Sequence, residues 1–209
     1  MKRIGILGGA FDPPHLAHVT LAQMALEQLA LDVLHVVPTG QAWHKTRALS
    51  PAKDRVAMAQ LAFRSNSLQE RYSGKIVVDD REAQRTGPSY TIDTVTEIER
   101  LYPKAKLFLI IGQDQALAFE RWKEPEQIVQ KAQVVIACRE MDLHPPSAPD
   151  LPAVKPSVLR DAIDLNCPLM PISATEVRAF IHQGLDVSQL VPELVLHYIQ
   201  QQGLYANNT

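Results

Sequence analysis

Short apolar runs alternate along the chain with longer segments in which apolar residues recur at helical spacing. Runs bounded by turn-forming or charged residues predict buried strands, and the spaced segments predict helices. The predicted strands cover residues 4–7, 33–37, 76–79, 107–111 and 134–137, with a last short strand around Leu169. The predicted helices cover residues 15–30, 51–65, 91–102, 115–121, 125–131, 175–183 and 192–202.

This alternation predicts an α/β fold: a Rossmann-like, doubly wound parallel sheet with helices on both faces and a small C-terminal helical part. Local signals agree with several helix ends. Ser50 is a good N-cap with Pro51 at the first helical position, and Gly184 and Gly203 fit C-caps. Ligands in such sheets bind beyond the carboxyl ends of the strands, so the polar residues that follow strands are the first candidates for a site.

The chain is long enough for one α/β domain, and we expect a single domain over residues 1–209. Its main α/β core covers residues 1–140, and its C-terminal part covers residues 168–209. Between them, residues 141–156 contain five prolines, which predicts a long irregular loop.

Composition narrows the class of protein. Apolar residues make up 46% of the chain, which is enough for a sizeable core, and the net charge of −2 does not favour a nucleic-acid binder. Two cysteines, Cys138 and Cys167, exclude a disulfide framework and a four-thiolate zinc site. This cysteine usage favours a cytoplasmic protein, and no apolar run is long enough to cross a membrane.

The segment 8–18, which reads Gly-Gly-Ala-Phe-Asp-Pro-Pro-His-Leu-Ala-His, carries the strongest chemical signal. It follows the first predicted strand and opens a helix, so its backbone N–H groups and the helix dipole favour an anion. Neither the G-x-G-x-x-G fingerprint nor a P-loop is present. His15 and His18 share one helix face. They could be a polar helix start or a zinc-ligand pair, but their place beside the turn favours stabilising phosphate charge.

A second anion site is predicted where residues 172–178 read Ile-Ser-Ala-Thr-Glu-Val-Arg. Ser173 and Glu176 form a capping box, which by itself needs no ligand. Thr175 and Arg178 also share a face at this helix N-terminus, which is typical of anion binding. Two such sites in a chain of balanced charge suggest a polyphosphate held at both ends.

Three further positions have open alternatives. Asp114, after the strand that ends at Gly112, caps the next helix or accepts hydrogen bonds from ribose hydroxyls. Trp122 belongs to the core or forms a stacking platform. Lys45 is a solvated lysine or a ligand contact, because its loop leaves the expected ligand edge of the sheet.

These motifs together resemble the nucleotidylyltransferase superfamily and, within it, the bacterial nicotinate-nucleotide adenylyltransferases. The resemblance rests on the segment 8–18, on residues 172–178, and on residues 87–94, which read Gly-Pro-Ser-Tyr-Thr-Ile-Asp-Thr. Residues 112–114, Trp122 and the C-terminal residues 191–205 extend it over nearly the whole chain. The pattern departs at Ala17, where the family usually has glycine, and at Ala42-Trp43, where prolines usually precede the His-Lys pair.

The resemblance implies adenylyl transfer from ATP to nicotinate mononucleotide, giving deamido-NAD and pyrophosphate, with Mg²⁺ bound through the ATP phosphates and not by a protein metal site. It implies catalytic roles for His15, His18, Lys45 and Arg178. It implies ATP contacts from Gly8, Gly9, Ala10, Phe11, Gly112, Asp114, Ile172, Ser173 and Thr175, and mononucleotide contacts from Thr86, Tyr90 and Trp122.

Other functions remain open at this point. An adenylyltransferase of the same fold could prefer nicotinamide mononucleotide or another phosphate acceptor. A nucleotide sensor without catalysis and a zinc protein using His15 and His18 are alternatives of other classes. No nucleic-acid or membrane partner is expected, and the oligomeric state cannot be derived from the sequence.

Overall fold

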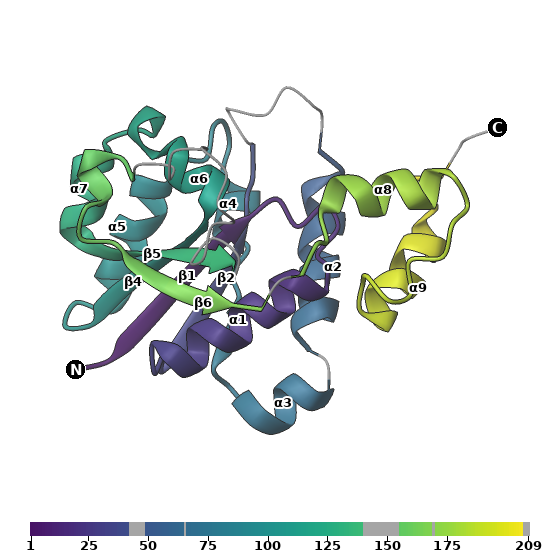
Figure 1. Cartoon of the computed structure of the whole chain (residues 1–209), viewed down its shortest axis with the longest axis horizontal. Helices are drawn as coiled ribbons and strands as arrows, with labels where there is room; N and C mark the ends of the chain where they lie inside the picture. The colour runs from purple at the N-terminus through teal and green to yellow at the C-terminus, as the bar shows by residue number, and fades with distance from the viewer. Residues whose placement is uncertain (42–48, 65, 140–154, 169, 207–209) are drawn as a thin grey trace, which may run out of the picture. The chain divides into compact units, whose positions relative to one another are not determined.

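The computed structural model describes residues 1–41, 49–64, 66–139, 155–168 and 170–206 (Figure 1). Within these residues, the strands form one six-stranded sheet in the order β3-β2-β1-β4-β5-β6. The strands are β1 (Arg3–Gly9), β2 (Val33–Pro38), β3 (Ile76–Val78), β4 (Lys106–Gly112), β5 (Ala132–Arg139) and β6 (Ile163–Cys167). The pairs β1–β4, β4–β5 and β5–β6 are parallel. This strand order is that of a Rossmann-like fold, so the predicted fold class is confirmed.

The helices up to residue 131 lie between strands in sequence, as the alternating pattern predicted, and the last two follow β6. They are α1 (Leu16–Gln28), α2 (Ala52–Phe63), α3 (Asn66–Tyr72), α4 (Arg81–Gln84), α5 (Thr91–Leu101), α6 (Gln113–Leu117), α7 (Pro125–Lys131), α8 (Ala174–His182) and α9 (Glu193–Gln202), with 3-10 turns η1 (Phe119–Arg121) and η3 (Ser157–Leu159). No helix of the described residues is both long and apolar enough to cross a membrane.

The chain divides into two compact units. The first unit comprises residues 1–8, 21–35 and 90–169, and the second comprises residues 9–20, 36–89 and 170–209. A division into compact units does not test whether the chain forms a single domain over residues 1–209, so that stays a prediction.

In the first unit, parallel strands form the core. β1 and β4 are neighbours in register, with Leu7 opposite Ile110, so Gly8 and Gly112 follow at adjacent strand ends. Phe108, Ile110 and Val135 are fully buried, as expected for strands covered on both faces. Helix α5 packs against α7, and α6 packs against β4 and β5.

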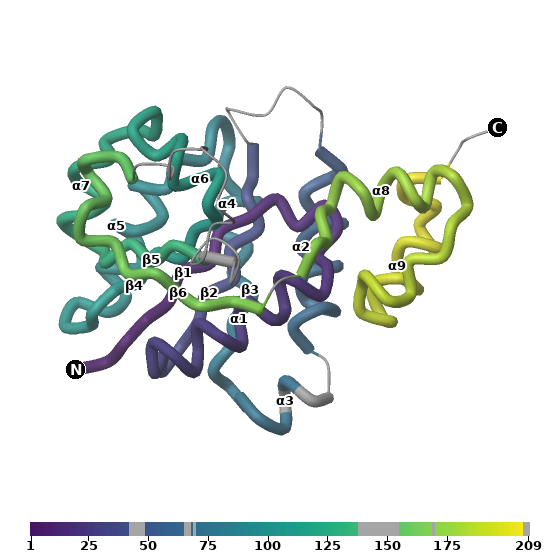
Figure 2. Tube along the Cα trace, in the orientation of Figure 1, coloured from purple at the N-terminus to yellow at the C-terminus, as the bar shows by residue number. Residues whose placement is uncertain are grey.

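In the second unit, α2 packs against α9, α4 and β3, and the trace in Figure 2 shows α2 beside α9. Met58 and Ala62 of α2 and Val195 of α9 are completely buried. Gly203 is the C-cap of α9, as predicted, whereas Gly184 follows Gln183, which is the C-cap of α8. Both glycines have positive φ angles, +60° at Gly203 and +70° at Gly184, which glycine adopts without strain.

Several local predictions are wrong. Ser50 is not a helix cap: Pro51 holds the N-cap position of α2, and Ser50 uses its backbone groups in contacts with Asp12 and Arg55. Asp114 does not cap its helix either, because Gly112 stands at the N-cap position of α6. Tertiary hydrogen bonds and the strand end override the local signals at these two positions.

Other element boundaries also differ from the prediction. The last strand is β6, ahead of the predicted place around Leu169, and Leu169 itself lies outside the described residues, as does most of the predicted loop 141–156. The predicted helix 115–121 is divided into α6 and η1. Helices α3 and α4 were not predicted, because α3 is mostly polar and α4 has only four residues.

Candidate active site

The turn after β1 lies in the second unit and is fixed by buried side chains and a backbone hydrogen bond. Phe11 adopts a left-handed conformation with φ of +48°, and its side chain is buried. Asp12 is only 1% exposed. The carbonyl of Gly9 accepts a hydrogen bond from the Thr39 N–H at 2.8 Å, which joins the turn to the segment after β2. These contacts therefore hold the turn in a defined conformation.

The two histidines lie together at the start of α1. His15 directly precedes α1 and His18 lies in its first turn, and their ring centroids are 3.8 Å apart, so the two rings lie side by side as predicted although His15 is not itself helical. The backbone N–H of His15 donates to Nδ1 of His18 at 3.2 Å, and the Phe11 ring packs edge-on against His18 with 5.0 Å between centroids. Because Nδ1 of His18 accepts this bond, the ring proton of neutral His18 is on Nε2. His18 therefore offers an Nε2–H donor.

His15 is buried and uncharged at neutral pH. Its side chain is 6% exposed, and its Nδ1 has no hydrogen-bond partner within the described part of the chain. Burial lowers its pKa from 6.5 to about 4. A neutral imidazole donates one directed hydrogen bond, so this ring can act as a fixed dipole toward an anion.

Helix α8 brings its N-terminal residues to the same turn. Ser173 and Glu176 form the predicted capping box: the Ser173 hydroxyl accepts from the Glu176 N–H at 3.2 Å, and the Glu176 carboxylate accepts from the Ser173 N–H at 3.1 Å. Arg178 donates through Nη2 to Thr175 Oγ1 at 3.1 Å and through Nη1 to the Asp12 carbonyl at 2.7 Å. The two segments that the sequence analysis singled out thus meet in the second unit.

Arg55 is a residue that the sequence analysis missed. Its side chain is 2% exposed, and its guanidinium donates to the carbonyls of Ala10, Thr39, Gly40 and Ser50 at distances of 2.5 to 3.2 Å. Burial lowers the pKa of Arg55, and the charge of Asp12 opposes that shift. The acceptors are backbone carbonyls, which leave no pattern in the sequence. Arg55 joins the turn to the segments on both sides of residues 42–48.

Gly40 shows how tightly this region is packed. A Cβ at this position would lie 2.0 Å from the Glu82 carbonyl oxygen and 2.6 Å from the Ser89 hydroxyl. Backbone atoms cannot yield as a flexible side chain does, so only glycine fits here. The carbonyl that Gly40 offers to Arg55 is therefore held in a fixed place.

Asp12 and Tyr205 form a second connection that the sequence analysis missed. Oδ1 of Asp12 accepts a hydrogen bond from the Tyr205 hydroxyl at 2.6 Å, and Oδ2 accepts one from the Ser50 N–H at 3.2 Å. Burial and the bond to Asp12 raise the pKa of Tyr205, so its hydroxyl stays protonated and donates. No sequence spacing links residues so far apart.

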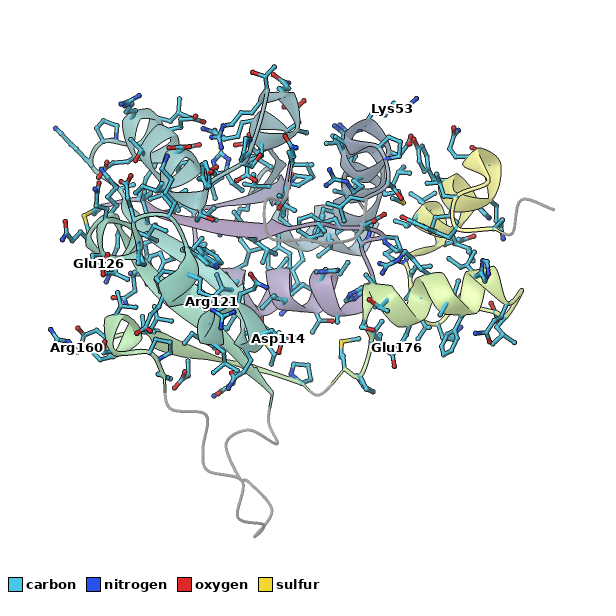
Figure 3. All side chains as sticks on the ribbon, turned by 90° about the horizontal axis from the view of Figure 1, so that it is seen from above. Lys53, Asp114, Arg121, Glu126, Arg160 and Glu176 are labelled. Atoms are coloured by element: carbon cyan, nitrogen blue, oxygen red, sulfur yellow. The ribbon has the colours of Figure 1, made fainter. Side chains whose placement is uncertain are left out.

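The first unit holds the predicted nucleotide contacts Asp114, Tyr90 and Trp122. Asp114 lies exposed in the first turn of α6, after the end of β4 at Gly112 (Figure 3). Trp122 is half-buried and lies against Phe119, with 4.9 Å between ring centroids. Lys123 Nζ is 4.5 Å from the centroid of the Tyr90 ring, which is a cation–π contact. Tyr90 and Trp122 are thus partly accessible aromatic side chains.

The remaining predicted residues are placed as follows. Gly8 ends the first unit's part of β1, and Gly9 and Ala10 continue into the turn. Thr86 is exposed in the second unit, and Ile172 is half-buried just before α8. Lys45 lies outside the described residues. Among the described residues, no group of three or more His, Cys, Asp or Glu side chains could hold a metal ion.

Comparisons with known proteins add an independent line of evidence. Residues 6–180 match the family described as cytidylyltransferase-like. A curated relative from Albidiferax ferrireducens, named probable nicotinate-nucleotide adenylyltransferase, is 46% identical and covers 98% of both chains. One of the same name from Methylibium petroleiphilum is 37% identical over 98% of this chain and 93% of its own.

A solved structure supports the fold. The structure titled Plasmodium falciparum nicotinic acid mononucleotide adenylyltransferase complexed with NaAD superposes with a TM-score of 0.75. It covers 98% of each chain at 22% sequence identity. At this identity the likeness concerns the fold.

Proposed function

Because the chain belongs to the nicotinate-nucleotide adenylyltransferases of the cytidylyltransferase-like family, we propose that it transfers the adenylyl group of ATP to nicotinate mononucleotide. A phosphate oxygen of the mononucleotide bonds to the α-phosphorus of ATP as the bond from that phosphorus to the β-phosphate oxygen breaks. Pyrophosphate leaves, and deamido-NAD is the product. The observation that carries this proposal is the contact of Arg178 with the Asp12 carbonyl, which sets two predicted phosphate-binding segments side by side.

Positioning and electrostatics supply the catalysis in this proposal. The attacking group is already an anionic phosphate, so the reaction needs no strong general base. In this proposal His18 donates a hydrogen bond from Nε2–H to the charge that builds up on the α-phosphate. The neutral ring of His15 lies beside His18 and stabilises the same charge. Arg178 and Thr175 hold the outgoing pyrophosphate at the N-terminus of α8.

The other proposed contacts follow the family resemblance. ATP is bound by Gly8, Gly9, Ala10, Phe11, Gly112, Asp114, Ile172, Ser173 and Thr175, and Lys45 contributes a positive charge to the phosphates. Nicotinate mononucleotide is bound by Thr86, Tyr90 and Trp122, with Trp122 stacking on the pyridine ring. The partial exposure of Trp122 and Tyr90 supports this part of the proposal.

We propose that Mg²⁺ accompanies ATP. A cation carried by the phosphate oxygens needs no cluster of protein ligands, and the site residues here are hydrogen-bond donors suited to a charged phosphate chain. When it is bound, magnesium neutralises part of the negative charge of the phosphates. We also propose a cytoplasmic location and small-molecule partners alone.

The test is pyrophosphate release with ATP and Mg²⁺, comparing nicotinate mononucleotide with nicotinamide mononucleotide. Faster release with the acid supports the proposal. Equal or reversed rates keep the adenylyl transfer and overturn the assigned acceptor. No release with either acceptor favours the nucleotide sensor, and stoichiometric zinc found by elemental analysis favours the zinc protein.

A further inference from the structure

The C-terminal segment of the described chain returns to the turn after β1. Helix α9 ends at Gln202, and its C-cap Gly203 adopts a left-handed conformation that redirects the chain. The Leu204 N–H donates to the Ile199 carbonyl at 3.0 Å. Tyr205 also has a positive φ, of +64°. This path brings the Tyr205 hydroxyl to 2.6 Å from Oδ1 of Asp12, which is 193 residues away in sequence.

Asp12 connects the parts of the second unit that we assign to the phosphates. Its carboxylate is buried and accepts from Tyr205 and from the Ser50 N–H, while its own carbonyl accepts from Arg178. A rotation of the Asp12 backbone would therefore move both the turn and the guanidinium of Arg178. A hydrogen bond to a buried carboxylate resists such a rotation more strongly than a bond between neutral groups.

We infer that Tyr205 is a positioning residue for adenylyl transfer: its hydroxyl fixes the Asp12 carboxylate and thereby the placement of Arg178 against the turn. This inference rests on the proposed function. The Tyr205 hydroxyl contacts Asp12 and no reacting atom, so its effect on the reaction passes through Asp12. The C-terminal segment then contributes to catalysis and not only to folding.

Tyr198 provides a matched control within the same segment. Its hydroxyl donates at 2.8 Å to Oδ1 of Asp54, a buried carboxylate on α2. The two tyrosines thus make the same kind of bond from the same segment to two different aspartates. One aspartate is in the turn, and the other is in a helix that packs against α9.

The experiment compares Tyr205→Phe with Tyr198→Phe in the full chain. Each substitution removes one hydroxyl and keeps the ring, and urea unfolding gives the stability of each variant. We expect Tyr205→Phe to lower kcat about tenfold with a smaller change in KM for ATP, because Arg178 and the turn are needed most in the transition state. Tyr198→Phe should keep kcat within about twofold even if its loss of stability is similar.

A double-mutant cycle with Asp12→Asn tests the route of the effect. If Tyr205 acts through Asp12, the loss of kcat in the double variant is smaller than the product of the two single losses. Independent losses, an unchanged kcat in Tyr205→Phe, or equal losses in both tyrosine variants would each overturn the inference. A wild-type protein that releases no pyrophosphate would instead contradict the proposed function, so the two failures are distinguishable.

Discussion

The backbone N–H of His15 donates to Nδ1 of His18, and this bond places the proton of neutral His18 on Nε2. Protonating Nδ1 would break the bond and set two N–H groups against each other. The bond thus leaves Nε2 of His18 as the ring nitrogen that is free of this backbone contact. A site that stabilises developing charge through fixed dipoles needs no reorganisation during the reaction.

We expect His18→Ala to lower kcat by about 10²-fold or more while the fold is kept, which is the scale for losing one preorganised donor. Steady-state pyrophosphate release measures kcat, and far-UV circular dichroism checks the fold. His197→Ala is the matched control, because His197 is an exposed histidine on α9. Near-normal turnover in His18→Ala would contradict the assigned role.

The buried state of His15 makes the stability of the fold depend on pH. Its folded pKa of about 4 lies below the unfolded value of 6.5, so the unfolded chain binds a proton first as the pH falls. The free energy of unfolding should fall by about 2 kcal/mol between pH 7 and pH 5 from this group alone. The loss is complete only below pH 4.

Urea unfolding at pH 7 and pH 5 measures this dependence. His15→Gln should show a loss smaller by about that amount, since the substituted residue does not titrate, whereas the exposed His197→Gln should follow the wild type. Equal pH dependence in wild type and His15→Gln would show that another group is responsible.

Arg55 should be among the residues on which stability depends most. Arg55→Met leaves the carbonyls of Ala10, Thr39, Gly40 and Ser50 without this donor, and we expect a loss of about 3 kcal/mol or more. Arg55→Lys should recover only part of it, because an ammonium group cannot reproduce the planar fork. Thermal and urea unfolding measure both variants.

The control for Arg55 is Arg64→Met, which removes an exposed arginine just beyond α2 and should change stability by less than about 0.5 kcal/mol. If Arg55→Met were as stable as this control, the buried guanidinium would contribute nothing to holding the turn.

Much of the fold was predictable, because buried parallel strands and amphipathic helices have different apolar periods. The strand β4 and the helix α7 were placed within a residue of their ends for this reason. The two segments that we propose to bind phosphate were recognised because glycine, histidine, hydroxyl and arginine residues cluster locally. Arg55 and the bond between Asp12 and Tyr205 were not, since their partners are backbone carbonyls or residues distant in sequence. Such contacts exist only after the chain has folded.

Trp122 tests the assignment of the mononucleotide site. The indole lies against Phe119 and remains half-buried, which leaves part of its surface open to a ligand ring. We expect Trp122→Ala to raise KM for nicotinate mononucleotide about tenfold or more, because stacking on an aromatic side chain contributes about 1–3 kcal/mol per base in related cases. KM for ATP should change by less than about twofold, and Trp122→Phe should recover most of the affinity because it keeps an aromatic face. If KM for both substrates rose together, with a matching loss of stability, Trp122 would be a core residue and not the stacking platform.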